Sequence, residues 1–196
     1  HYTEGNDTRN EDFNTEDNLL HTLRADFTQK YKALDGKLSV GAKYSNLSSR
    51  IHTDYYAFVN GQADVQGNYM DRYRYTEDVY ALYAKYSFMW KSFHFNAGVR
   101  MEYARLSPQS SINPERNHTS HYTDLFPEAG ISYAINKEKG HHLSFHYNRG
   151  LSRPSIGSLN PLVIRNNEYS YSMGNPFLKP YFNDNFSLTS TWFDKY

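Results

Sequence analysis

The feature that most constrains this chain is a long alternation of apolar and polar residues. From residue 19 to residue 33, odd positions are mostly apolar, with Gln29 as the main interruption, and even positions from 22 onward are polar or charged, such as Arg24 and Asp26. A period of two places successive side chains on opposite faces of an extended strand. Because a run of about fifteen residues exceeds the usual strand of about five or six, we expect a long strand with one apolar face.

The same alternation recurs along the chain, and turn signals separate the runs. Asp35-Gly36 follows the first run, and Asp-Gly is a strong hairpin signal. Short polar turns also occur at residues 89–92 and 136–140, and no segment shows a helical period. The sequence therefore predicts an all-β, antiparallel, up-and-down sheet. Its seven expected strands are residues 19–33, 37–44, 79–88, 93–103, 127–135, 141–148 and 185–193.

The connections between these strands alternate between short and long. Those after the second, fourth and sixth strands are long, and they span residues 46–76, 104–121 and 150–182. Long structureless connections are uncommon inside compact domains, and this alternation means that all three leave from the same edge of the sheet. The asymmetry is typical of outer-membrane β-barrels, whose periplasmic turns are short and whose extracellular loops are long.

Composition bears on two interpretations of the apolar faces. Aromatic residues make up 17% of the chain, although the mean hydropathy is −0.83. In a transmembrane barrel, the apolar faces contact lipid, the polar faces line a wet lumen, and aromatic girdles lie at the headgroups. In a soluble β-sandwich, a second sheet would bury Leu23, Phe27, Phe95 and Phe145. Aromatic residues at strand ends favour the barrel, and they are Tyr31, Tyr44, Phe88, Tyr103 and Trp192.

Several classes of function find little support in the sequence. The 21 basic residues balance the 21 acidic ones, so no basic field attracts nucleic acid. The absence of cysteine excludes disulfides and thiolate metal sites. His118, His121 and Asp124 are close in sequence, but three such residues in a loop are weak grounds for a metal site. Glu102 and Glu128 fit a polar lumen wall and form no nucleophile–base set. We therefore predict no enzyme activity, no metal and no cofactor.

The strand count suggests a piece of a larger barrel. Residues 1–17 are polar and acidic, which predicts a polar loop or leading segment, and the barrel domain is expected over residues 18–196. Bacterial single-chain barrels have even strand numbers, and open sheet edges are not tolerated in lipid. Seven strands are therefore expected to require further strands to close.

Three motifs follow the sixth strand: Arg153-Pro154-Ser155, Leu159-Asn160-Pro161 and the segment from Gly174 to Pro180. Together with residues 97–103 and 125–133, they resemble TonB-dependent outer-membrane receptors of the outer membrane protein β-barrel family. The resemblance implies about seven strands of a 22-stranded plugged barrel in the outer membrane of a Gram-negative bacterium. It also implies energy-coupled import of a scarce solute. The implied partners are lipid, the rest of the barrel and plug, TonB acting through a plug expected outside this sequence, and a small-molecule, peptide or glycan ligand.

The proline-rich motifs are expected to be structural. Each proline removes an amide donor and restricts the backbone, so the segment can cross the extracellular rim without adding a strand. Arg153 is expected to hydrogen-bond rim carbonyls. The residues assigned to this rim are Arg153, Pro154, Asn160, Pro161, Gly174, Asn175, Pro176 and Pro180.

Ligand contact is predicted in the connection over residues 46–76, where aromatic side chains accompany arginines. The candidates are Tyr55, Tyr56, Phe58, Tyr69, Arg72, Tyr73, Arg74 and Tyr75. Alternatively, these side chains pack the loop against itself or belong to the outer girdle. Two other functions stay open, a non-transport barrel such as a scaffold or adhesin, and a soluble carbohydrate-binding β-sandwich.

Overall fold

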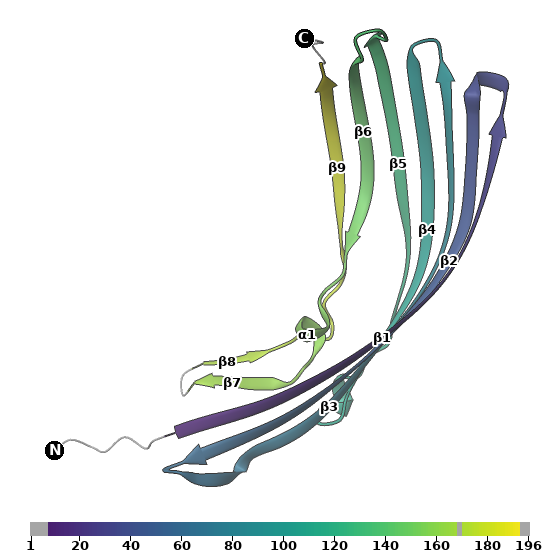
Figure 1. Ribbon diagram of the computed structural model, residues 1–196. Coiled ribbons are helices and arrows are strands. Elements are labelled where there is room, and N and C mark those ends of the chain that lie inside the picture. The colour runs from purple at the N-terminus through teal and green to yellow at the C-terminus, as the bar shows by residue number, and fades with distance from the viewer. Residues whose placement is uncertain (1–7, 168–169, 193–196) are drawn as a thin grey trace.

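The computed structural model describes residues 8–167 and 170–192. Most of this chain forms one antiparallel sheet of seven strands, in the order β1-β2-β3-β4-β5-β6-β9 (Figure 1). Its strands are β1 (Thr8–Tyr31), β2 (Gly36–Val59), β3 (Gln62–Trp90), β4 (Phe93–Ser110), β5 (Ser120–Asn136), β6 (His141–Ser152) and β9 (Tyr181–Thr191). A two-stranded sheet contains β7 (Val163–Asn167) and β8 (Ser170–Met173). The predicted all-β antiparallel fold is confirmed.

Three short helical segments accompany the strands, although none was predicted. They are η1 (Ala33–Asp35), η2 (Pro114–Arg116) and α1 (Ile156–Leu159). Across the described ranges, no helix has the length and apolar character needed to cross a membrane.

Three tight turns lie at one end of the sheet, the turn end, at the top of Figure 1. In the first, Leu34 and Asp35 adopt positive φ angles of 55° and 48°. Gly36 of the predicted Asp-Gly turn has a φ of −68° and begins β2 instead. A glycine suits this position because a Cβ there would lie 2.6 Å from the hydroxyl oxygen of Tyr86. Close approach to a neighbouring strand, rather than turn geometry, therefore accounts for this glycine.

At the opposite end, four strands run far beyond their predicted limits and form the extension, residues 8–18, 46–59, 62–77 and 104–110. The polar loop predicted over residues 1–17 is wrong for residues 8–17, which lie in β1, and its residues 1–7 lie outside the described residues. The long connection predicted over residues 46–76 is also wrong, because most of these residues lie in β2 and β3. β2 and β3 meet at Asn60-Gly61, whose φ angles are 53° and 77°. Asn-Gly is the strongest short signal for a type I′ hairpin, and the prediction of a loop over residues 46–76 did not take it into account.

The apolar alternation changes phase where the extension begins. In β2, apolar residues occupy even positions from Leu38 to Tyr44, but odd positions at Leu47, Ile51 and Tyr55. Successive side chains point to opposite faces of a strand. The apolar face of β2 therefore moves from the convex side of the sheet to the concave side.

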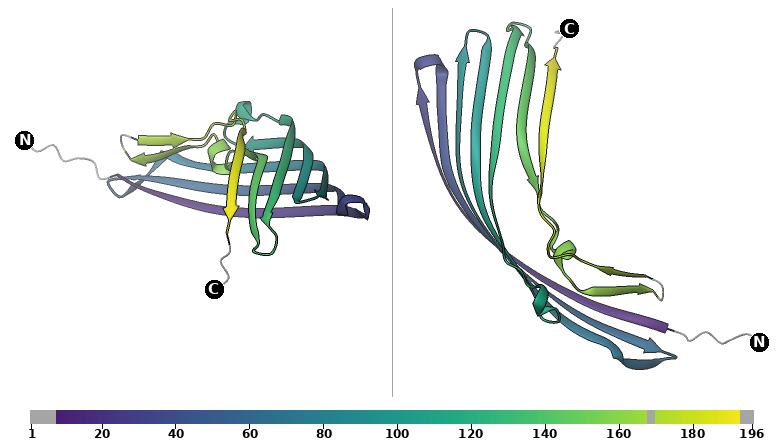
Figure 2. Two further views of the ribbon diagram at one scale, coloured as in Figure 1. Left: turned by 90° about the horizontal axis from the view of Figure 1, so that it is seen from above. Right: turned by 180° about the vertical axis from the view of Figure 1, so that it is seen from behind.

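Residues 153–180, the cap, cover the concave side of the extension (Figure 1, Figure 2). The cap contains α1, β7 and β8. Leu159 of α1 packs in a buried cluster with Tyr73 and Tyr75 of β3 and with Leu106 of β4. This buried hydrophobic cluster lies between the extension and the cap, and the change of phase in the strands supplies its apolar side chains.

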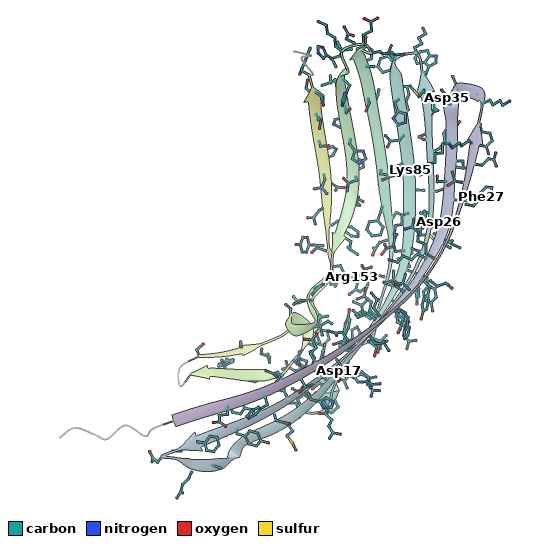
Figure 3. All side chains as sticks on the ribbon, in the orientation of Figure 1. Asp17, Asp26, Phe27, Asp35, Lys85 and Arg153 are labelled. Atoms are coloured by element: carbon teal, nitrogen blue, oxygen red, sulfur yellow. The ribbon has the colours of Figure 1, made fainter. Side chains whose placement is uncertain are left out.

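Between the extension and the turn end, the convex face carries an exposed apolar belt. Leu23 is 72% exposed, Phe27 59% and Phe145 43%. Phe95 stacks on Phe88 of the neighbouring strand, with ring centroids 5.0 Å apart, and Figure 3 shows Phe27 on the convex side. A β-sandwich would bury such a face under a second sheet. The fold therefore contradicts the sandwich interpretation and suits contact with lipid.

The described sheet is curved but open. β1 and β9 are its two edges, and they do not pair with each other. Membership of a larger, 22-stranded barrel therefore stays a prediction.

Candidate ligand-binding site on the concave face

Charged side chains cover the concave face of the belt. Arg24 Nε lies 2.6 Å from Asp26 Oδ2, and the hydroxyl of Tyr83 donates a hydrogen bond to Asp26. Lys85 Nζ lies 2.7 Å from Glu128 Oε1. These pairs are partly solvated, and exposed ion pairs contribute little to stability. Their effect is to give this face the charged, wet character of a lumen wall.

Two glycines make room for this wall. A Cβ at Gly41 would lie 2.5 Å from the ring of Tyr83, and a Cβ at Gly98 would lie 2.8 Å from Glu128 Oε1. Both occupy polar-face positions in the alternation, where a strand would ordinarily carry a side chain. Glycines at such positions are therefore a sequence signal for a large side chain lying across the neighbouring strand.

An ion-pair network joins the cap to the extension. Arg153 Nη2 donates to Glu102 Oε2 at 2.9 Å, and Arg153 Nε lies 3.3 Å from Glu77 Oε1. Arg100 Nε donates to Glu102 Oε1 at 2.5 Å, and the hydroxyl of Tyr75 donates to Glu77 Oε2 at 2.8 Å. The described side-chain contacts of Arg153 are thus to carboxylates and not to the predicted rim carbonyls. The cause of this correction is that β6 ends at Ser152, whereas β3 and β4 run alongside and present Glu77 and Glu102 to Arg153.

Burial changes the chemistry of the tyrosines in this network. Burial first, and then the neighbouring carboxylate of Glu77, raises the pKa of Tyr75 above its ordinary value. Burial also raises the pKa of Tyr73, with a smaller contribution from Asp71. Both phenols therefore stay neutral: Tyr75 packs and donates its hydrogen bond to Glu77, and Tyr73 acts as a packing group.

The proline-rich motifs fold the cap. The amide of Gly174 donates to the carbonyl of Asn160 at 3.0 Å, and the amide of Asn175 donates to the carbonyl of Ser158 at 2.7 Å. Gly174 leaves no space for a side chain, because a Cβ there would lie 2.8 Å from the carbonyl oxygen of Ser158. Asn113 Nδ2 donates to the carbonyl of Pro161 at 3.2 Å and so ties the cap to the segment after β4.

The pleat separates the eight candidate ligand residues. Tyr55, Tyr73 and Tyr75 face the concave side and are at most 5% exposed. Four others occupy the opposite phase on the convex side, and they are Tyr56, Phe58, Arg72 and Arg74. The side chain of Tyr69 lies outside the described residues. The structure does not bring these residues together on one ligand-binding surface. It places Tyr73 and Tyr75 in the buried core, in agreement with the alternative that these side chains pack the segment internally.

An open hollow lies between the extension and the cap on the concave side. Its described lining holds hydroxyl, amide and apolar groups and no charged side chain. Inside it, the hydroxyl of Thr53 donates to Asn14 Oδ1 at 2.7 Å. The polar residues of the lining are Asn14, Thr53, Ser155, Ser158, Asn160 and Ser172. This chemistry suits an uncharged polar ligand, and of these residues only Asn160 was assigned a role from the sequence.

Aromatic rows border the belt. Tyr44, Tyr80 and Tyr103 are registered side by side on three strands, with ring centroids 4.8 Å and 6.3 Å apart. Trp90 lies ten positions along β3 from Tyr80 and is 50% exposed. Ten residues cover about 33 Å of strand, or about 25 Å of height at a tilt of about 40°, which matches the usual apolar band. The tyrosine row therefore marks one border of the belt.

The three residues considered for a metal do not converge. His121 Nδ1 lies 2.8 Å from the hydroxyl oxygen of Tyr103. The ring of His118 packs near Phe177, with centroids 5.8 Å apart. Within the described ranges, no three histidine, aspartate or glutamate side chains are placed to hold a metal ion.

Comparisons with known proteins bear on this geometry. The family model of the Outer membrane protein beta-barrel family matches residues 1–196. No curated protein matches the chain. Among solved structures, the chain is similar to the ferric citrate transporter FecA in its unliganded form, with 14% identity and a TM-score of 0.58. That match covers 73% of this chain and 22% of the FecA chain, so it shows a shared fold over a small part of the transporter.

Proposed function

Because the chain belongs to the outer membrane protein beta-barrel family and lies in the outer membrane of Gram-negative bacteria, we propose that it forms part of the wall of a TonB-dependent transporter. The observation that carries this proposal is the change of phase between belt and extension. In the belt, the apolar face is convex and the charged face is concave. In the extension, the concave face is instead buried under a folded cap. A wet wall below a cap is the arrangement expected along the path of a polar solute.

The two ends of the sheet support one orientation in the membrane. Barrels of this class have short periplasmic turns and long extracellular segments. The turn end, with η1 and the short turn at Lys91, therefore faces the periplasm. The extension and the cap face the outside of the cell, where a scarce solute is first met.

The uncharged hollow between cap and extension is the place where this chain would contact the ligand. Hydroxyl and amide groups there, such as Thr53 and Asn160, can replace the hydration of a polar solute. A plug domain, supplied outside this sequence, would close the lumen, and TonB would act on that plug. The ligand class we favour is an uncharged polar compound such as an oligosaccharide or a peptide.

Uptake by the full-length protein tests this function. Cells that express it would be given labelled oligosaccharides, peptides and ferric chelates, with and without a protonophore. We expect one class to accumulate, and its accumulation to cease when the protonophore removes the energy that TonB transmits. Surface binding without uptake would favour a scaffold or adhesin and would overturn the transport proposal.

A further inference from the structure

Arginines gather on the convex face of the extension, away from the candidate ligand site. Arg50 of β2 is registered directly opposite Arg74 of β3, and Arg72 lies two residues before Arg74 in β3. Arg105 of β4 lies on the same face, opposite Asp78. Arg50, Arg72 and Arg74 are exposed and line an open groove. Its polar neighbours are His52, Gln109, Ser110, Ser111 and Asn117.

No carboxylate lines this groove within the described residues. Asp17 is registered opposite Arg50, and Asp78 is registered opposite Arg105. Nevertheless, in the part of the chain that the structure describes, no ion pair within 4.0 Å joins these arginines to an acidic side chain. The described arginines that do form ion pairs are Arg24, Arg100, Arg149 and Arg153.

The pairing of two arginines is unfavourable unless an anion lies between them. Like charges directly opposite each other destabilise a sheet, and Arg50 and Arg74 are placed in this way. A guanidinium presents a fork of donors that fits phosphate oxygens in a bidentate manner. A bridging phosphate would therefore turn the repulsion between these two strands into attraction.

The height of the groove above the belt indicates the kind of anion. Arg105 lies two positions beyond Tyr103, and Arg74 lies six positions beyond Tyr80. These separations correspond to about 7 Å and about 20 Å along the strands, or about 5 Å and about 15 Å of height at a tilt of about 40°. A phospholipid headgroup layer adds only about 5–8 Å to each side of the hydrocarbon core. The groove thus extends past phospholipid headgroups but stays continuous with the lipid-facing surface.

We infer that this convex groove binds the phosphorylated oligosaccharide headgroup of a glycolipid in the outer leaflet. Arginines at several heights would hold phosphate groups, and the amides of Gln109 and Asn117 would meet sugar hydroxyls. Lipid bound there would anchor the extension laterally in the membrane. The inference rests on the extracellular orientation proposed above, but it is independent of which solute is imported.

The test uses the full-length protein in detergent, with purified lipopolysaccharide that carries a phosphorylated inner core as the probe. The variant is Arg50→Gln/Arg72→Gln/Arg74→Gln, which removes charge but keeps long polar side chains. We expect the variant to bind the probe about tenfold or more weakly than wild type. The wild type should lose a similar factor when the probe is treated with phosphatase. A difference in gel migration between unheated and heated samples of the variant would show that its barrel is folded.

A matched variant at the turn end distinguishes the loss of a local binding site from a general effect of lowering the net positive charge. Lys32→Gln/Lys91→Gln/Lys137→Gln removes the same charge from the periplasmic side and should bind the probe as wild type does. Equal binding of the arginine variant and wild type would overturn the inference. So would equal binding of intact and phosphatase-treated lipid, or full competition by a soluble acidic polysaccharide. A failed uptake assay would leave these binding results unchanged, so the two proposals can fail separately.

Discussion

Replacing Arg153 with methionine tests whether charge holds the cap on the extension. The guanidinium lies 2.9 Å from Glu102 and 3.3 Å from Glu77. The three side chains are only 24%, 11% and 15% exposed, in the order Arg153, Glu102, Glu77. Removing the cation leaves the partly buried Glu77 without a described cationic partner, while Glu102 keeps Arg100. Breaking a fully buried pair costs about 3–5 kcal/mol. Because solvent reaches part of this site, we expect the cap to lose about 2–3 kcal/mol of local stability.

Hydrogen exchange on the full-length protein in lipid nanodiscs measures this loss. The amides of Gly174 and Asn175 donate to carbonyls inside the cap, so they exchange when the cap opens. A loss of about 2–3 kcal/mol corresponds to exchange about 30- to 150-fold faster. The rest of the sheet should be unaffected, since the network joins only the cap to β3 and β4.

Arg149→Met is the matched control, because it removes a guanidinium that pairs with Asp184 at 2.8 Å in the sheet. This control should leave exchange in the cap unchanged. Adding Glu77→Gln to Arg153→Met should recover part of the lost protection, since Arg153 is the only described cation beside Glu77, whereas Glu102 keeps its ion pair with Arg100. If Arg153→Met changed the exchange of cap amides by less than about threefold, the network would not hold the cap and the reasoning would be refuted.

The remaining predictions concern the belt, the lumen wall and the buried tyrosine. Leu82→Lys on the convex belt should destabilise the barrel by about 2–4 kcal/mol, measured by urea unfolding from lipid vesicles. Ser39→Lys on the concave face should destabilise it by less than about 1 kcal/mol in the same assay. Equal losses of stability would contradict the assignment of the two faces. Gly41→Ala should cost about 1–3 kcal/mol through overpacking against Tyr83, and Tyr83→Ala should relieve it, so an additive double variant would count against that contact. The pKa of Tyr75 is raised in the fold, so its contribution is complete below about pH 10 and falls as pH rises through the folded pKa. Tyr75→Phe should therefore show a smaller increase in subtilisin cleavage of the cap between pH 9 and pH 11 (about one unit either side of the free phenol) than wild type does, and parallel increases would refute this.

Much of the fold could be predicted because the lipid-facing and lumen-facing sides of a membrane strand are visible in its local alternation of apolar and polar residues. Leu23 and Phe27 alternate with Arg24 and Asp26, and this period of two is sufficient to assign both faces of β1 without any tertiary information. The strand limits could not be predicted in the same way. Beyond Tyr44 the alternation continues in the opposite phase, which is easily taken for a loop when only one phase is followed.

The candidate site was predicted poorly for a related reason. Proximity in sequence grouped Arg72, Tyr73, Arg74 and Tyr75, but the pleat sends neighbours to opposite faces. The tyrosines became the core beneath the cap, and the arginines became the convex groove. Arg153 was recognised as a key residue of the rim, yet its partners, Glu77 and Glu102, come from strands 51 or more positions away.

The sequence by itself determined the antiparallel sheet, the lipid-facing belt and the family of the chain, because a period of two and a proline-rich motif are local properties. Only the tertiary structure decided what the second phase of the alternation packs against. Covering the concave side of the extension requires the cap to fold back across β3 and β4. That contact depends on long-range packing and a shared charge network, which no local pattern encodes.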